Sequence, residues 1–385
     1  MHDVIVVGAG PAGLFTALCL ARGGRDVLVL EEHDVIGAPT HCTGVISGEL
    51  QELYKIPEEV VLHCPTVCRV IAPSGAAAEF VRGGEDIAVL DRAAFDRALA
   101  RGAQDAGATV ATSSRVDDIR VGRGVVEVGT GRGRVHLARA VVVASGVAYR
   151  FHRRMDFGLP PRLLHTAQIE LEGTPGDALE IHLGRQIAPE GFAWLVPIRR
   201  DGEPRLKAGV LLRGDARTRL RTFLASPRVA PRVGAVNGEP VFRLLPVAPP
   251  RRTYGPRTLL VGDAAGLTKP LTGGGIFYSL LSASLAAETL EDALALDDLG
   301  ARRLARYEAR WRQRLGGEIR TGGWFRHLLA NFTDRELEAF VRAVGSDDVR
   351  ALIHTMARFN WHRSVILALV RQPGIKSILL RSLFR

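Results

Sequence analysis

The sequence predicts an α/β fold, with a discontinuous Rossmann-like domain, an inserted and mostly antiparallel β-sheet domain, and a helical C-terminal region. Three observations predict it. An apolar strand at residues 4–7 runs into a glycine-rich turn and an apolar helix. A second strand, glycine turn and helix follow far downstream, from residue 258. Between them, strand-like runs alternate with Gly, Pro and charged turns, as in antiparallel sheets.

The first element is a dinucleotide-binding turn. Three glycines follow the first strand and open the first helix, so backbone N–H groups can approach a pyrophosphate at the positive helix end. A carboxylate ends the second predicted strand, 26–30, where it can accept hydrogen bonds from a ribose 2′-hydroxyl. The pattern favours FAD or NAD over NADP, although the turn alone could be an ordinary tight turn. The cofactor contacts predicted here are Gly8, Gly10, Pro11, Ala12, Gly13 and Glu31.

The next elements complete the same domain. Asp91 can cap a helix that carries Phe95 and Leu99 on one face. A short strand follows at 108–112, then a Gly-rich meander at 115–137 and an apolar strand at 138–144. We predict cofactor contacts from Val110, within the first of these two strands, and from Gly146, just after the second.

The downstream segment distinguishes FAD from a nicotinamide cofactor. Residues 258–261 read as a buried strand, and a glycine turn opens the helix 276–290. An aspartate at such a strand end suits the ribitol hydroxyls of a flavin, and the glycines allow backbone to approach the pyrophosphate and the isoalloxazine. A simple nicotinamide dehydrogenase has no need of this second site, so both pieces together predict FAD. The predicted contacts are Gly262, Asp263, Gly273, Gly274, Gly275 and Ile276.

The remaining segments give the domain organisation. We predict an FAD-binding domain at 1–60, 91–148 and 251–300, and a substrate domain at 61–90 and 149–250. Strand-like runs at 179–183, 192–198 and 206–212 suit a sheet that roofs the flavin. Residues 301–385 read as a helical C-terminal region. The expected core positions of the last helices are Leu290, Leu294, Tyr307, Trp311 and Leu315.

Composition narrows the possible partners and the location. The chain has 385 residues, is 46% hydrophobic and carries a net charge of +10. The arginines that supply this charge are scattered rather than clustered on a nucleic-acid-binding fold, so we predict no nucleic-acid partner. We see no secretory signal and no apolar run long enough to span a bilayer, and therefore expect a cytoplasmic protein with reduced thiols. The cysteines have no second closely spaced pair, so no metal site is predicted.

The end of the chain leaves two interpretations open. Residues 364–385 mix Ile and Leu with Arg and Lys around a Pro373–Gly374 break. Part of this stretch could lie in a lipid interface, which would make the protein peripheral at a membrane surface. The alternative is a C-terminal helix packed on the flavin domain.

Five motifs together resemble the geranylgeranyl reductase family, within the wider flavoproteins built like para-hydroxybenzoate hydroxylase. The resemblance covers about the first three hundred residues. The first and last motifs are shared across the superfamily, and the Cys-x-Gly turn with the aromatic-x-Trp-x-x-Pro strand points to the reductases. The motifs are GAGPAG with Glu31, HCTGVIS at 41–47, DRAAFDRAL at 91–99, APEGFAWLVP at 188–197 and GDAAG…P…GGGI at 262–276.

The resemblance implies an enzyme that uses FAD to reduce isolated C=C bonds of a prenyl lipid. It implies cofactor contacts from Arg92 and Pro270, and a lipid cavity lined by Phe192, Trp194 and Pro197. It also places Cys42 in a turn beside the flavin, with Cys42 and His41 as candidate proton donors. Only one dinucleotide fingerprint is visible, so NAD(P)H must bind transiently or electrons must come from a donor protein.

Two alternatives remain from the sequence. A flavin monooxygenase or halogenase would use the same cofactor frame on a hydrophobic substrate, and a carrier flavoprotein would have no turnover of its own. Phe192 stands where halogenases have the first Trp of their strand motif, and where the reductases commonly have Tyr. Ser145–Gly146 replaces an Asp–Gly pair common in the hydroxylases. Phe192 and Trp194 could also be plain core aromatics, since alternate strand positions share a face.

Overall fold

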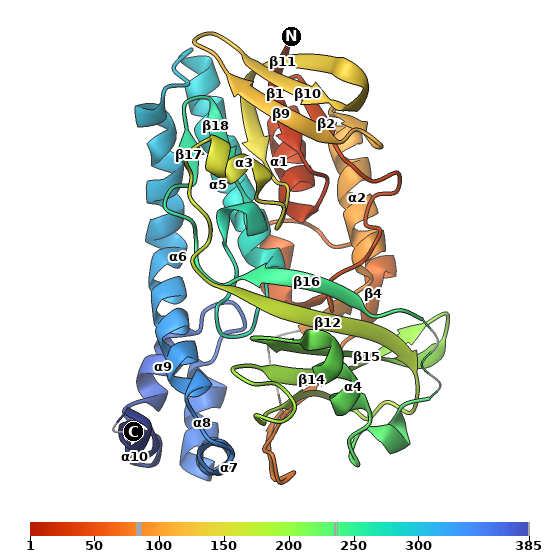
Figure 1. Cartoon of the computed structure of the whole chain (residues 1–385), viewed down its shortest axis with the longest axis vertical. Coiled ribbons are helices and arrows are strands. Elements are labelled where there is room, and N and C mark those ends of the chain that lie inside the picture. Colours follow the sequence, from red (N-terminus) through yellow and green to blue (C-terminus); the bar gives the residue numbers. More distant parts are fainter. Residues whose placement is uncertain (82–86, 235, 237, 384–385) are drawn as a thin grey trace.

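Two large sheets, one above the other along the long axis, organise the computed structural model (Figure 1). The structure describes residues 1–81, 87–234, 236 and 238–383. Residues 82–86 and parts of the segment around residue 236, all in the predicted substrate domain, and residues 384–385 of the predicted lipid-facing stretch lie outside this description. The predicted α/β fold with a helical C-terminal region is confirmed.

The first sheet has a parallel core of apolar strands. β1 (His2–Val7) lies between β2 (Val27–Leu30) and β11 (Arg134–Val143), with β8 (Thr109–Ala111) beyond β2 and β18 (Thr258–Leu260) beyond β11. The second half of β11 pairs with β1 and β18, and its first half pairs with β10 (Val126–Thr130), which pairs in turn with β9 (Val116–Val121). Parallel strands end at the same edge, so the loops after β1, β2, β11 and β18 lie together there.

Three helices pack side by side on this sheet. α1 (Pro11–Arg22) contacts both α2 (Arg92–Asp105) and α5 (Ile276–Ala295). The carboxylate of Asp91 accepts a hydrogen bond from the Ala94 N–H at 3.0 Å, so the predicted cap of α2 is confirmed. α5 ends at Ala295, five residues beyond the predicted end at 290, because its apolar face continues through Ala293 and Leu294.

The second sheet is antiparallel except for one pair. Its order is β16 (Val241–Pro246), β12 (Leu163–Glu172), β15 (Glu203–Leu212), β14 (Phe192–Arg200), β13 (Ala178–His182), β5 (Val67–Ile71) and β6 (Ala77–Val81). Only β13 and β5 run parallel. One face of this sheet packs on α4 (Ala216–Leu224), and a small sheet of β3 (Val45–Ser47), β7 (Ile87–Leu90) and β4 (Val61–His63) lies beside it.

Of the C-terminal helices, the first runs beside both sheets and the others gather at one end of the molecule (Figure 1). They are α6 (Ala301–Ala330), α7 (Asp334–Val344), α8 (Asp347–Met356), α9 (Arg363–Leu369) and α10 (Pro373–Leu383). All five predicted core positions, from Leu290 to Leu315, are buried. In α10, Ile375, Ile378 and Leu379 pack into the core with α7, so this side of the helix is packed, but on the C-terminal helices rather than on the flavin domain as the alternative expected.

Candidate active site

The glycines after β1 divide into tight and open positions. Gly8 has φ +106°, and a Cβ there would lie 2.5 Å from the Ala144 carbonyl oxygen. A Cβ on Gly13 would overlap the carbonyl oxygen of Gly8, so the helix approaches the strand only with glycine at this position. A Cβ on Gly10 would meet nothing within 4 Å. Open space therefore lies in front of the α1 N-terminus, where no side chain caps the helix.

The carboxylate after β2 is held against this turn. Glu31 Oε2 accepts a hydrogen bond from the Ala9 N–H at 2.7 Å, and Oε1 accepts one from the His33 N–H at 3.0 Å. The Glu31 N–H donates to the Ala111 carbonyl at 2.9 Å, which joins the end of β2 to the end of β8 beside Val110. Gly146, with φ +58°, follows β11 and has open space over its Cα. These predicted contacts therefore share one edge of the sheet.

The two distant motifs meet at the start of α1. A Cβ on Gly262 would lie 2.8 Å from the Cβ of Ala12, and Pro11 is the first residue of the same helix. Asp263 reaches toward the N-terminus of α5, since a Cβ on Gly275 would lie 3.3 Å from its Oδ1. Burial raises the pKa of the Asp263 carboxyl to about 6, and the positive charge of Arg92 opposes this shift.

Arg92 connects this carboxylate to the cysteine turn. Its guanidinium binds both carboxylate oxygens of Asp96, at 3.0 Å from Nη2, and also hydrogen-bonds Cys42. The Gly44 N–H lies 3.3 Å from the Cys42 sulfur, so the turn itself holds the thiol. The structure thus brings together Arg92, Cys42 and Asp263, three residues from three separate segments.

His41 does not have the state that a proton donor requires. Its Nε2 contacts the Arg243 guanidinium, and burial, together with this and other nearby cationic groups, lowers the pKa of His41 to about 3. The imidazole is therefore neutral at physiological pH. This environment does not favour His41 as a catalytic acid, because the neutral imidazole has no readily ionised proton and can only accept a hydrogen bond from the guanidinium; its catalytic role stays a prediction.

The loop before α5 is fastened to α6. Lys269 donates its N–H to the Gly274 carbonyl at 3.0 Å, which closes the glycine turn, and Gly273 adopts φ +74°. Arg326 of α6 donates to the carbonyl oxygens of Pro270 and Leu271 at 3.2 and 3.3 Å. Ile276 is buried as the first residue of α5. These hydrogen bonds therefore hold the loop that is predicted to lie near the isoalloxazine in place against α6.

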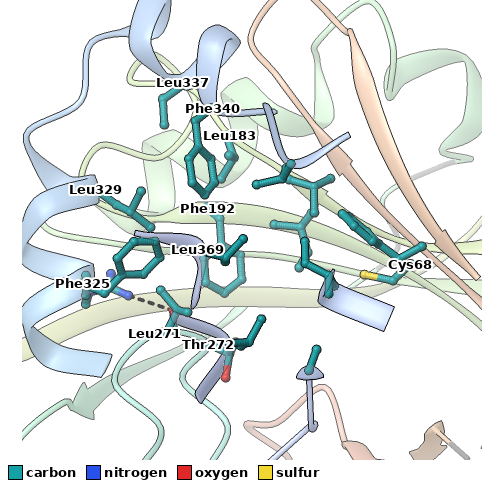
Figure 2. Close-up of a pocket in the computed structure, with 18 of the residues that line it drawn as sticks. Cys68, Leu183, Phe192, Leu271, Thr272, Phe325, Leu329, Leu337, Phe340 and Leu369 are labelled. Atoms are coloured by element: carbon teal, nitrogen blue, oxygen red, sulfur yellow. Dashed lines mark hydrogen bonds between the residues drawn. The ribbon is translucent and has the colours of Figure 1, made fainter. Parts of the chain in front are cut away.

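A large apolar cavity adjoins this loop. It has a volume of about 1250 Å³, compared with about 300–1,000 Å³ for typical small-molecule pockets. Figure 2 shows apolar side chains from several elements converging on it, with the loop residues Leu271 and Thr272 at one side. The labelled wall is formed by Phe325 and Leu329 of α6, Leu337 and Phe340 of α7, Leu183 after β13, Phe192 of β14, Leu369 of α9 and Cys68 of β5.

The aromatic strand motif contributes one residue to the wall rather than three. Phe192 lines the cavity, whereas Trp194 lies behind it, with ring centroids 5.9 Å apart. Gly209 on β15 allows this, since a Cβ there would overlap the indole ring. Pro197 does not line the cavity and, by strand alternation, lies on the opposite face from Phe192 and Trp194. Trp194 and Pro197 are therefore not among the residues that line this cavity, and their contact with the substrate stays a prediction.

Just over half of the cavity residues come from the C-terminal region, 301–385, for which the sequence indicated no contact with a substrate. Phe325, Leu329 and Phe340 have the spacing of ordinary helix core residues, so nothing in the sequence separates a cavity wall from a packed core. Lys207 had a detectable signal, because a lysine interrupts the apolar strand segment LKAGVLL. It is buried beside the Cys42 turn.

Comparison with known proteins identifies the class. The family model for FAD-dependent oxidoreductases matches residues 3–84 and 82–254. The chain is 34% identical to digeranylgeranylglycerophospholipid reductase 2 of Methanopyrus kandleri, with 91% of this chain and 92% of the relative covered. It is 31% identical to the digeranylgeranylglycerophospholipid reductase of Methanothrix thermoacetophila, with 93% and 96% covered.

Solved structures share the fold. A geranylgeranyl bacteriochlorophyll reductase-like protein from Thermoplasma acidophilum matches with a TM-score of 0.85 at 24% identity, over 98% of each chain. The halogenase PltM matches with a TM-score of 0.71 at 16% identity, over 99% of this chain and 90% of that one. At these identities the likenesses establish the fold alone.

The chain is thus an FAD-dependent oxidoreductase. Within that class it belongs to the geranylgeranyl reductase family, as its curated relatives over more than nine-tenths of the chain show.

The geometry and chemistry of the residues at this site fit FAD. Open space lies at Gly10 before an uncapped helix N-terminus, which suits a pyrophosphate. At the downstream motif, burial raises the pKa of the Asp263 carboxyl. His41 Nδ1, in the segment of the cysteine turn, is buried and has no hydrogen-bond partner among the described residues, as expected where a ligand completes the site. Within the described part of the chain, no cluster of three or more metal-binding side chains occurs.

Asp263 should make apoprotein stability depend on pH. Its folded-state pKa of about 6 lies above the ordinary 3.8, so its favourable contribution is present at low pH and is lost as pH rises through 6. We expect Asp263→Asn to stabilise the apoprotein at pH 7.5 by up to about 3 kcal/mol, and to weaken FAD binding. Denaturant unfolding at pH 7.5 and pH 4 checks this, because the gain should shrink toward pH 4. An equal gain at both values would contradict it.

Proposed function

We propose that the protein saturates isolated C=C bonds in the prenyl chains of a geranylgeranylated glycerophospholipid. The observation that carries the proposal is the apolar cavity of about 1250 Å³ that ends at the isoalloxazine loop. Its walls are mostly apolar, with Phe and Leu the commonest residues, so a hydrocarbon chain can be buried there with each CH₂ contributing about 0.8 kcal/mol. The head group is taken from the names of the curated relatives.

Different residues would bind the cofactor and act on the substrate. The turn glycines, Glu31 and Asp263 would hold FAD, with Arg92 between the ribitol side and the cysteine turn. When bound and reduced, the flavin supplies hydride from N5. An unactivated alkene also needs a proton, and Cys42 is the candidate acid beside the site. The apolar wall excludes water, which would otherwise quench a developing carbocation.

The electron source is a separate proposal. One dinucleotide fingerprint is visible and suits FAD, so we propose that NAD(P)H binds only transiently or that a donor protein supplies the electrons. Stopped-flow mixing of the oxidised protein with NADH or NADPH distinguishes the two. Flavin bleaching within the turnover time supports direct reduction, and no bleaching supports a donor protein.

We further propose peripheral contact with a membrane at the end where the C-terminal helices gather (Figure 1). None of the described helices is long and apolar enough to cross a bilayer. Trp324, Leu367 and Leu380 are exposed on these helices, and arginines of α8 and its following loop line the cavity. Apolar side chains beside cationic ones suit an anionic lipid surface.

Replacing Trp324 and Leu380 together by Ser should reduce co-sedimentation with anionic phospholipid vesicles several-fold, because two apolar side chains would leave the interface. Val135→Ser, on exposed β11, is the control at the other end of the molecule. Equal partitioning of all three proteins would contradict membrane contact through this end.

A substrate panel tests the proposed function. The dithionite-reduced protein is given geranylgeranyl chains on a glycerophospholipid, on diphosphate and on free alcohol, and products are identified by mass. Two added hydrogens per double bond, fastest on the glycerophospholipid, are expected. Equal rates on all three would reject the head-group assignment but keep the chain reduction.

A further inference from the structure

A buried lysine on β15 faces the cysteine turn. Lys207 lies within an apolar strand and is only 7% exposed, although lysine ordinarily carries a charge and lies at the surface. Its strand neighbours Ala208 and Val210 pack on α4, whereas Lys207 and Gly209 lie on the face toward the cavity and the FAD-binding domain. Burying an ammonium group costs free energy unless it has partners, so this position requires an explanation.

The contacts of Lys207 hold the turn that carries Cys42. Nζ donates hydrogen bonds to the Thr43 carbonyl at 2.9 Å and to the Leu90 carbonyl at 3.1 Å. Thr43 is the residue after Cys42. Both carbonyls would remain bonded if Lys207 lost one proton, because a neutral amine still has two N–H donors and an ammonium has three. One proton of Lys207 is therefore mobile without breaking either contact.

The charges around Lys207 come from four elements. Cys42, Glu170 of β12 and Asp91 before α2 favour its charged form, and Arg200 of β14 opposes it. Arg200 is itself paired with Glu170 at 2.6 Å and with Asp91 at 2.7 Å. Burial outweighs these effects and lowers the pKa of Lys207 to about 8. At neutral pH the group is charged, yet it can release a proton at moderate cost.

We propose that Lys207 returns a proton to Cys42 after each double bond is reduced. This rests on the proposed function, with Cys42 as the acid. In the reduction, the Cys42 S–H bond breaks as a C–H bond forms on one alkene carbon, and the hydride with its electron pair forms the C–H bond on the other. An N–H bond of Lys207 then breaks as the S–H bond re-forms. Water protonates the amine, so each double bond consumes one hydride and one proton.

The chemical reactivity of Cys42 tests the contact without the cofactor. Apoprotein is alkylated with iodoacetamide at pH 7.5, and the Cys42 peptide is followed by mass. Removing the nearby cation in Lys207→Met should slow Cys42 alkylation three- to tenfold, because the thiolate loses a stabilising charge. Arg205→Met, two residues away on β15, removes a cation that lies 3.9 Å from Glu172 and should leave the rate unchanged. Equal rates in both variants would overturn the proposal.

Turnover separates proton return from a structural role. With one equivalent of reduced flavin, Lys207→Met should form the first product within about twofold of the wild-type rate, while continuous turnover falls at least tenfold. Lys207→Arg retains a cation but cannot release a proton near neutral pH, so it should restore alkylation and not continuous turnover. Full recovery of turnover in Lys207→Arg would overturn the relay.

The remaining outcomes are also decisive. If neither variant folds, wild-type continuous turnover should fall above about pH 8 while the single reduction changes less, and two profiles of the same shape would overturn the relay. A wild-type protein that reduces no prenyl substrate removes the proposed function and the relay with it. In that case the alkylation result still reports whether Lys207 acts on Cys42.

Discussion

Gly10→Ala is expected to lose FAD binding by at least tenfold while the apoprotein stays within about 0.5 kcal/mol of the wild-type stability. A Cβ at Gly10 meets no protein atom within 4 Å, so the folded chain can accept it. The space that it enters lies before the α1 N-terminus, where the pyrophosphate is expected. The effect therefore falls on the cofactor and not on the fold.

Gly13→Ala should behave differently, because its Cβ would overlap the backbone oxygen of Gly8. A backbone atom cannot rotate away as a side chain can, so we expect a loss of about 1–3 kcal/mol or more even without FAD. Gly124→Ala, in a turn with open space, is the control. Thermal unfolding of the apoproteins and titration with FAD check all three. Equal destabilisation by Gly10→Ala and Gly13→Ala would contradict the division between cofactor space and packing contact.

The second large effect is expected from filling the cavity. Leu329→Trp places a larger side chain from α6 into the wall shown in Figure 2. If it displaces two CH₂ groups of the bound chain, binding weakens by about 1.6 kcal/mol, or roughly 15-fold. FAD affinity should not change, since Leu329 does not belong to the cofactor loops. A substrate with a single isoprene unit should be affected much less.

Leu296→Trp is the matched control, because Leu296, just after α5, is exposed and does not line the cavity. Rates for long and short chains, measured at equal flavin occupancy, give the result. A loss of FAD in Leu329→Trp, or the same decrease with both chain lengths, would show that the cavity does not hold the prenyl chain.

The fold around the expected cofactor site could be predicted from the sequence because its signals are local. Glycine spacing, strand periodicity and the Asp91 cap each arise within a few residues, and the shared edge of a parallel sheet then brings Gly10, Glu31 and Asp263 together. The meeting of Gly262 with Ala12 followed from two motifs of known order. These predictions required no knowledge of side-chain packing.

The substrate side was less predictable because it depends on contacts between distant segments. Strand alternation predicts that Phe192 and Trp194 share a face. It does not predict that Gly209, which has no side chain, leaves room for the indole ring outside the cavity wall. The state of His41 depends on Arg243, two hundred residues away in the chain. The regular apolar spacing of the C-terminal helices likewise did not indicate that they form part of the cavity wall.

In the proposed reaction, reduced flavin adds hydrogen to a prenyl double bond in this cavity. The most direct test reduces the purified flavoprotein anaerobically with dithionite, adds a geranylgeranylated glycerophospholipid, and follows flavin reoxidation and product mass together. We expect reoxidation without oxygen and a gain of two hydrogens for each flavin oxidised. A flavin that stays reduced until air is admitted, with a product heavier by one oxygen atom, would contradict the account and indicate a monooxygenase.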